Sequence, residues 1–203
     1  MKSNDDKCHL IIANQDNLTV NLGEETIESS KSVELLGLTI DNNLTFKDHV
    51  TYLCKKGNQK LHALARISKY MSFEKRKLIM KTFVESQFNY CPLVWMFHNR
   101  TLNNKINRLH ERALRIVYQN QELSFQQLLN LDCSATIHQR NLRKLATEMY
   151  KIKNNLSPSP VVELFINNTN THNLRSRRCW ELPNTRTVTY GTETIRYRGT
   201  KTW

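Results

Sequence analysis

Four basic residues recur at helical spacing near the middle of the 203-residue chain: Lys105, Arg108, Arg112 and Arg115. Steps of three, four and three residues put them in one row along an α-helix, about 100° round from the apolar stripe of the same segment. Such a row can follow a phosphate backbone, because each cation that contacts a phosphate releases condensed counterions. A solvated helix face is the alternative for this row alone. Additional lysines on the preceding helical segment favour phosphate binding. They are Lys75, Lys77 and Lys81.

Two other sets of residues could hold a metal ion, and both are incomplete. Asp5 and Asp6 are adjacent, and paired aspartates hold two metal ions in nucleotidyl transfer. A pair of that kind should lie at a turn between apolar strands, whereas the residues before Asp5 do not form one, so a solvated loop is favoured. Cys133 and His138 lack two further ligands at zinc-finger spacing. The sequence therefore predicts no metal site and no complete catalytic set.

A run of aromatic residues precedes the basic row. It contains Phe83, Phe88, Tyr90, Trp95 and Phe97. Nucleic-acid bases could stack on such side chains. Runs of this kind more often form the core between helices, and we favour that interpretation.

Charge divides the chain into an acidic beginning and a basic remainder. Lys and Arg number 30 against 18 Asp and Glu, which gives a net charge of +12. Residues 1–46 carry 3 − 8 = −5, so residues 47–203 carry 27 − 10 = +17. A basic excess confined to one part of the chain indicates a polyanionic partner, most commonly nucleic acid. An anionic membrane surface would require a helix with a large apolar face and no core to join.

Cysteine usage and apolar segments indicate an intracellular protein, nuclear or cytoplasmic. The five cysteines are odd in number and widely spaced, which predicts free thiols in a reducing compartment. The first residues lack the apolar core of a secretory signal, and no apolar run approaches the ~18 to 20 residues of a membrane span. We expect neither secretion nor a membrane partner.

The pattern of apolar residues predicts an α+β fold. Residues 9–14, 18–22, 26–27 and 35–40 have strand-like patterns and predict a small antiparallel meander. Residues 47–71 carry a long helical stripe, and Ser72 is a good N-cap for a second helix. On that helix we expect one inward face, consisting of Leu78, Ile79, Phe83, Gln87, Phe88 and Cys91, until Pro92 ends or kinks it.

Three more helices complete the predicted bundle. Thr101 and Ser124 are the expected caps of the third helix and of a short helix through Leu129, and residues 137–156 form a fifth helix. Beyond them the chain is polar and basic, with weak strand signals at 185–190 and 194–197. The predicted organisation is a strand region at 1–46, a helical bundle at 47–156 and a partly irregular basic extension at 157–203.

Several segments, in order along nearly the whole chain, form a specific combination. They are 4–9 (NDDKCH), 35–41 (LLGLTID), 44–50 (LTFKDHV), 88–95 (FNYCPLVW), 105–115 (KINRLHERALR) and the final GTKTW. Together they resemble the C-terminal half of the reverse transcriptase of non-LTR retrotransposons of the jockey-like (LINE) type. Any one of these segments alone would be weak evidence for the resemblance.

The resemblance implies a function and several residue roles. The strands up to residue 46 would be the end of the palm subdomain, and the helices from 47 would be the thumb, which holds an RNA and DNA template–primer. Lys7 matches the family's N-x-x-K lysine near the incoming triphosphate, where it would protonate the pyrophosphate leaving group. Leu36 and Gly37 match the hairpin at the primer grip, and Gly37 suits a close approach of the backbone.

The chain departs from the family pattern at the catalytic carboxylates. The family's metal-binding aspartates lie in an early palm strand and in an aromatic-x-Asp-Asp hairpin, and the 203 residues contain neither. Asp5 and Asp6 fall inside the later N-x-x-K segment instead. Because polymerisation needs two Mg²⁺ ions, we expect this chain alone to hold no cofactor and to be inactive.

The resemblance leaves three interpretations open. Relatives continue beyond the Gly-x-Lys-x-Trp segment, so Trp203 is expected to mark a truncation, and the missing fingers and palm of the same polymerase are a possible partner. The chain is then a polymerase fragment that binds template–primer. A non-enzymatic nucleic-acid-binding module and a non-functional retroelement relic are the alternatives.

Overall fold

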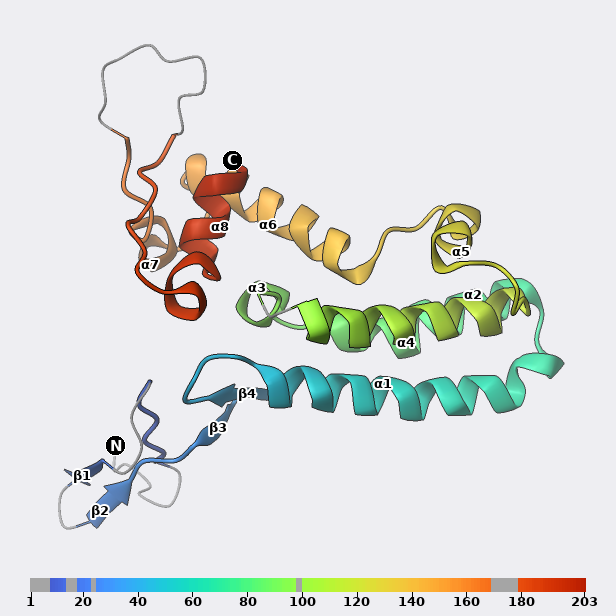
Figure 1. Cartoon of the computed structure of the whole chain (residues 1–203), viewed down its shortest axis with the longest axis horizontal. Helices are drawn as coiled ribbons and strands as arrows, with labels where there is room; N and C mark the ends of the chain where they lie inside the picture. Colours follow the sequence, from blue (N-terminus) through green and yellow to red (C-terminus); the bar gives the residue numbers. More distant parts are fainter. Residues whose placement is uncertain (1–7, 14–17, 23–24, 98–99, 169–178) are drawn as a thin grey trace.

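Two long helices that run in the same direction, α1 (Lys47–Ile67) and α4 (Arg100–Tyr118), form the centre of the computed structural model (Figure 1). The structure describes residues 8–13, 18–22, 25–97, 100–168 and 179–203. The predicted stripe of α1 is confirmed: Val50, Leu53, Leu61 and Leu64 are buried, and a 3₁₀ turn at Ser68–Tyr70 follows the helix. Gly57 lies in the same stripe, where a Cβ would come within 2.7 Å of Leu109 Cδ1. The glycine therefore allows α1 and α4 to pack closely.

The second helical segment changes its geometry along its length. Ser72 caps α2 (Phe73–Ile79) as predicted, and a π-helix η3 (Met80–Val84) and a 3₁₀ helix η4 (Glu85–Phe88) follow. The predicted inward face is wrong for Leu78, Phe83 and Cys91, which are exposed, whereas Met80 and Val84 are buried. For Phe83 the prediction assumed a constant 100° per residue, and the π-turn that begins at Met80 breaks that period.

Pro92 begins a helix rather than only ending one. The segment before it stops at Phe88, Cys91 has a left-handed φ of 40°, and Pro92 is the first residue of α3 (Pro92–Trp95). Proline suits this position because the first N–H of a helix has no partner within it. Thr101, the expected cap of the next helix, lies inside α4.

The next two helices start at capping boxes. Ser124 with Gln127 begins α5 (Phe125–Asp132), which runs three residues beyond the predicted end. Thr136 with Gln139 begins α6 (Ile137–Lys153), which ends before Leu156, and that side chain is 69% exposed. Both helices lie on the side of α4 that faces away from α1 (Figure 1).

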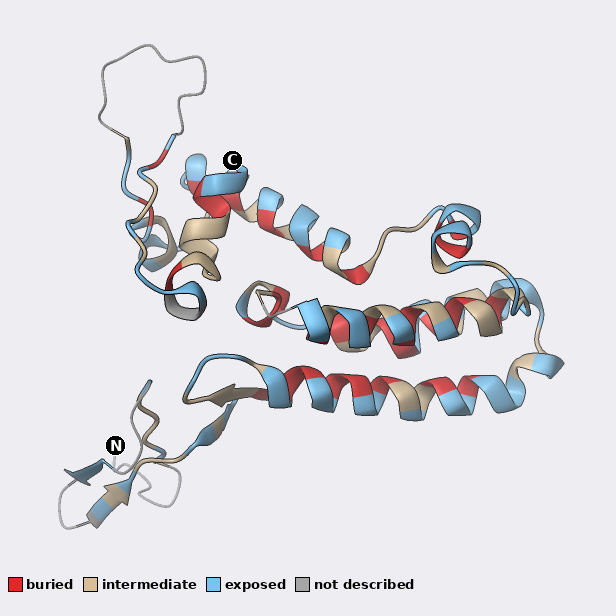
Figure 2. Ribbon diagram, in the orientation of Figure 1, coloured by how far each residue is buried: buried red, intermediate tan, exposed pale blue. Residues whose placement is uncertain are grey.

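Buried side chains form two clusters, one between α1, α2–η4, α4 and α5, and one between α6 and the C-terminal segment (Figure 2). Phe88 and Trp95 are 1% and 0% exposed, which confirms the core interpretation for these two aromatic residues. Tyr90 and Phe83 are exposed, so the aromatic run is divided between core and surface.

The strands form two separate hairpins instead of one meander. Strand β1 (Thr19–Leu22) pairs with β2 (Glu25–Glu28), and β3 (Ser32–Leu35) pairs with β4 (Leu38–Asp41). Residues 35–40, predicted as one strand, therefore contain a turn. Among residues 9–13 the only ladder contact is a bridge between Leu10 and Ser29. Three or more strands normally give a sheet its own stability, so β3–β4 depends on its contact with α1.

The C-terminal segment is more helical than predicted. It contains α7 (Ser159–Val162), a π-turn η5 (Val188–Thr192) and α8 (Ile195–Thr202), which packs on α6. The strands predicted at 185–190 and 194–197 are wrong, because Thr194 caps α8 and directs the chain into a helix. Phe165 and Trp180 are buried against α6, so this segment is part of the second core.

The structure confirms the α+β class: strand hairpins come first and helices follow. Within the described residues, no helix is long and apolar enough to cross a membrane.

Candidate nucleic-acid interface

The basic row predicted from the sequence lies along one flank of α4. Leu109 packs on Gly57 of α1, and His110 contacts Glu85 of η4. Arg108 and Arg112 are each two residues from His110, which is about 200° round an α-helix. The row therefore lies on the flank of α4 that faces away from α2–η4.

The four residues of the row differ in their contacts. Lys105, Arg108 and Arg112 are exposed, whereas Arg115 is half-buried and pairs with Glu111 at 2.7 Å. Arg112 Nη1 donates a hydrogen bond to Asn58 Oδ1 on α1, at 3.1 Å. Carboxylates of the described residues thus form an ion pair with one of the four, and the other three are accessible to an external anion.

Helix α1 extends the basic surface. Lys55, His62 and Arg66 lie within about 80° of Asn58 on the helix and are exposed. Asn58 contacts Arg112, so these side chains border the row on α4. We call this surface the ridge flank. It consists of Lys55 and Arg66 from α1 and Lys105, Arg108, Arg112 and Arg115 from α4.

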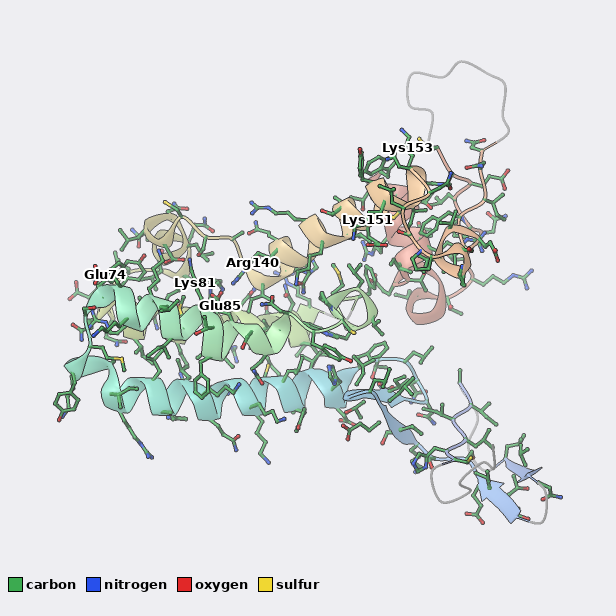
Figure 3. All side chains as sticks on the ribbon, turned by 180° about the vertical axis from the view of Figure 1, so that it is seen from behind. Glu74, Lys81, Glu85, Arg140, Lys151 and Lys153 are labelled. Atoms are coloured by element: carbon green, nitrogen blue, oxygen red, sulfur yellow. The ribbon has the colours of Figure 1, made fainter. Side chains whose placement is uncertain are left out.

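The lysines of the α2–η3 segment do not join the ridge flank. Lys77 Nζ lies 2.7 Å from Asp132 Oδ1, and this bond raises the pKa of Lys77, so its charge is used within the bundle. Lys75 and Lys81 are exposed, and Figure 3 shows Lys81 in the view from behind. Their segment lies across α4 from the row, so the structure divides the seven predicted residues between two faces.

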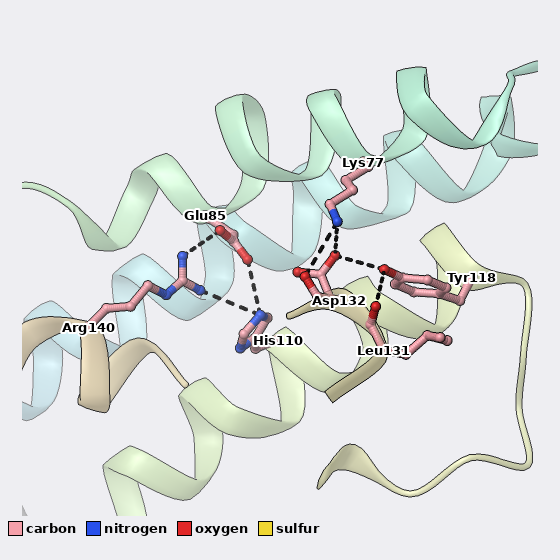
Figure 4. Close-up of polar contacts among 7 residues, drawn as sticks. All are labelled: Lys77, Glu85, His110, Tyr118, Leu131, Asp132 and Arg140. Atoms are coloured by element: carbon pink, nitrogen blue, oxygen red, sulfur yellow. Dashed lines mark hydrogen bonds and ion pairs between the residues drawn. The ribbon is translucent and has the colours of Figure 1, made fainter. Parts of the chain in front are cut away.

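A buried ionic network holds α4 to η4 and α6 (Figure 4). His110 Nε2 lies 3.0 Å from Glu85 Oε1, and Arg140 Nη1 lies 2.6 Å from Glu85 Oε2. A carboxylate only accepts hydrogen bonds, so Nε2 of His110 carries the hydrogen. Burial raises the pKa of Glu85, but the hydrogen bonds from His110 and Arg140 outweigh it and lower the pKa to about 2.

A second network joins α2, α4 and α5. Asp132 has a fully buried side chain, bonded to Lys77 and to the Tyr118 hydroxyl at 2.9 Å (Figure 4). Burial raises the pKa of Asp132, and the bonds from Lys77 and Tyr118 help to lower it below the ordinary value. We call these two sets the polar clasps.

The sequence analysis missed both clasps. One signal was available: His110 falls four residues after Ile106 and three before Ala113, so it lies on the buried stripe of α4. Glu85 and Asp132 had no such signal, because their partners are distant in the sequence.

The turn at Leu36–Gly37 is an exposed feature beside the helices. Both residues have positive φ, 51° and 80°, as a two-residue type I′ hairpin requires. Leu36 is 83% exposed, and the Tyr90 hydroxyl donates a 2.7 Å hydrogen bond to its carbonyl oxygen. Leu36 and Gly37 therefore form a tight turn, and Tyr90 ties it to the helical region.

The remaining candidate residues give no site in the described part of the chain. Lys7, Asp5 and Asp6 lie outside the described residues. Among those that are described, no three His, Cys, Asp or Glu side chains form a group that could hold a metal ion.

No protein-family model matches the chain, and no significant similarity is found to a curated protein or to a solved structure.

Proposed function

We propose that this chain is the palm-end and thumb portion of a reverse transcriptase of a jockey-like non-LTR retrotransposon, and that it binds a template–primer of RNA and DNA. The motif segments that resemble this family occur in one order along the chain. Strand hairpins followed by helices agree with that order. A type I′ turn at Leu36–Gly37 suits a backbone approach to a primer strand.

The ridge flank is the observation that carries the binding part of the proposal. Lys105, Arg108 and Arg112 are exposed along one line, and no described carboxylate forms an ion pair with them. Five of the acidic residues after position 46 are engaged in ion pairs elsewhere. They are Glu85, Glu111, Asp132, Glu148 and Glu193. The free positive charge is therefore concentrated on surfaces such as this one, where phosphates can neutralise it.

The proposal assigns binding, and not bond formation, to these 203 residues. No aromatic-x-Asp-Asp segment occurs in them, and in the family the two Mg²⁺ ions are held by such carboxylates. Lys7 would assist the chemistry only when those carboxylates are supplied. The exposed Leu35 and Leu36, 57% and 83% accessible, are apolar surface that the rest of a palm could cover.

Charge reversal on the ridge flank tests the binding. We expect the Arg108→Glu/Arg112→Glu variant to bind a labelled RNA/DNA hybrid more weakly. The slope of log affinity against log salt should become shallower by about 1.8, or 0.9 for each lost phosphate contact. Fluorescence anisotropy over a salt series measures both quantities.

The matched control is Lys75→Glu/Lys81→Glu, which removes the same charge from the other face. Affinity should fall less and the slope change less than in the ridge variant. Equal losses in both variants would show that binding follows net charge alone, and would overturn the ridge flank as the interface.

Primer extension tests the chemical part. With Mg²⁺, a primed RNA template and deoxynucleoside triphosphates, we expect no product from the chain alone. Clear incorporation would refute the assignment of binding without catalysis.

A further inference from the structure

A basic groove lies between α3 and α6. Its volume is about 470 Å³. One wall comes from Asn89, Pro92 and Leu93, and the other from Arg143, Lys144 and Lys151. A volume in this range is typical of small-ligand sites. The groove is therefore large enough for a nucleotide unit and too small for a duplex.

The cations of this groove have little anionic compensation. Glu148 is its one carboxylate, and it already accepts a 2.6 Å hydrogen bond from the Ser157 hydroxyl and pairs with Lys151 at 3.4 Å. Lys144 donates only to neutral oxygens of Asn89, at 3.3 and 3.5 Å. Burial and the nearby Arg140 lower the pKa of Lys144, so a bound anion would favour its charged form.

The other groups at the groove suit the rest of a nucleotide. Leu93 and Pro92 give it an apolar wall, and Asn89 supplies an amide.

The groove is separate from the ridge flank. Asn89 directly follows η4, the segment that His110 contacts, and Arg108 and Arg112 lie about 200° away round α4. Figure 3, drawn from behind, shows Arg140 and Lys151 along α6 on this side of the molecule. One straight duplex could not contact both surfaces.

We propose that the α3–α6 groove binds the phosphate backbone of single-stranded nucleic acid, with Arg143 and Lys144 as the principal phosphate contacts. It is a second site that shares the partner class of the proposed function but does not depend on duplex binding at the ridge flank. A chain with both sites could hold a duplex on one face and an unpaired strand on the other.

Two double variants and two probes test this site in the full chain. The probes are a short labelled oligouridylate and the labelled RNA/DNA hybrid. We expect Arg143→Gln/Lys144→Gln to weaken oligouridylate binding on the order of tenfold at 0.1 M salt, and to reduce its salt slope by about 1.4. Hybrid affinity should change less than twofold. Circular dichroism and urea unfolding establish that the variant folds.

The matched control is Arg108→Gln/Arg112→Gln, which should weaken hybrid binding and leave oligouridylate binding within twofold. Unchanged oligouridylate affinity in the groove variant would overturn the proposal. Equal weakening of both probes by both variants would overturn it as well, because it would indicate one undivided surface. If the groove variant weakens oligouridylate binding as expected but the ridge variant leaves hybrid binding unchanged, the proposed function fails while the groove proposal stands.

Discussion

The two flanks of α4 both carry polar side chains and use them differently. On one flank, His110 and Tyr118 contact buried carboxylates from η4 and α5. On the other, Arg108 and Arg112 are exposed, and the contact recorded for Arg112 is a neutral amide on α1. A buried charge must be paired because desolvation is costly, whereas an exposed charge needs no partner in the fold. Polar groups on the first flank therefore stabilise the bundle, and those on the second remain available to a ligand.

The largest effect should come from removing the central carboxylate of a polar clasp. Glu85→Gln leaves Arg140 and buried His110 without their anion, so we expect a loss of about 3 kcal/mol in the free energy of unfolding. Urea unfolding measures it. The control is Glu111→Gln, which breaks the more exposed ion pair with Arg115 and should cost less than about 1 kcal/mol. Equal losses of unfolding free energy in the two variants would show that the buried and the exposed ion pairs stabilise the fold to the same extent.

Acid should weaken the same clasp. The folded pKa of Glu85 is about 2, against an ordinary value of 4.5. Above pH 4.5 the carboxylate is ionised in both states and its stabilisation is fully present. As the pH falls towards 2, the unfolded chain takes up a proton before the folded chain does, so stability is lost. We expect about 3 kcal/mol from this residue over that window.

Chemical denaturation from about pH 6 to about pH 2 measures this loss. Glu85→Gln should have a flatter pH profile than the unaltered chain, since the variant lacks the titrating group. Identical profiles would show that other carboxylates, such as Asp132, dominate acid unfolding.

A smaller effect should follow from forcing α1 away from α4, which would disturb the support of the ridge flank. Gly57→Val places branched carbons where a Cβ alone comes within 2.7 Å of Leu109. We expect a loss of about 2 kcal/mol in urea unfolding. Ala63→Val, an exposed position of α1, should cost less than about 1 kcal/mol. A tolerated Gly57→Val would mean that Leu109 repacks freely.

The smallest effect on stability is expected from changes on the ridge flank. Arg108→Gln/Arg112→Gln removes two charges but only one recorded hydrogen bond, so the free energy of unfolding should change by no more than about 0.5 kcal/mol. Thermal and urea unfolding provide the measurement. A loss above about 2 kcal/mol would give these arginines a structural role and argue against a ligand surface.

Local patterns predicted the elements whose signals lie within one helix or cap. The stripe of α1, the Ser72 and Ser124 caps and the row on α4 all follow from spacing over a few residues. Elements whose backbone departs from the regular period were predicted less well. The predicted inward position of Phe83 was wrong because a π-turn precedes it. The prediction of one strand over 35–40 was wrong because Leu36 adopts a left-handed conformation that leucine rarely takes.

The sequence by itself determined that the chain has an α+β fold and a basic row along a helix, because helical period, caps and charge act over short distances. Only the tertiary structure decided which charged side chains form ion pairs within the fold. Lys77 became part of a clasp while Arg108 stayed open, because Asp132 lies 55 residues from Lys77 in the chain and reaches it only when α5 packs beside α2. Spacing fixes where a side chain points on its own helix, and packing fixes what it meets there.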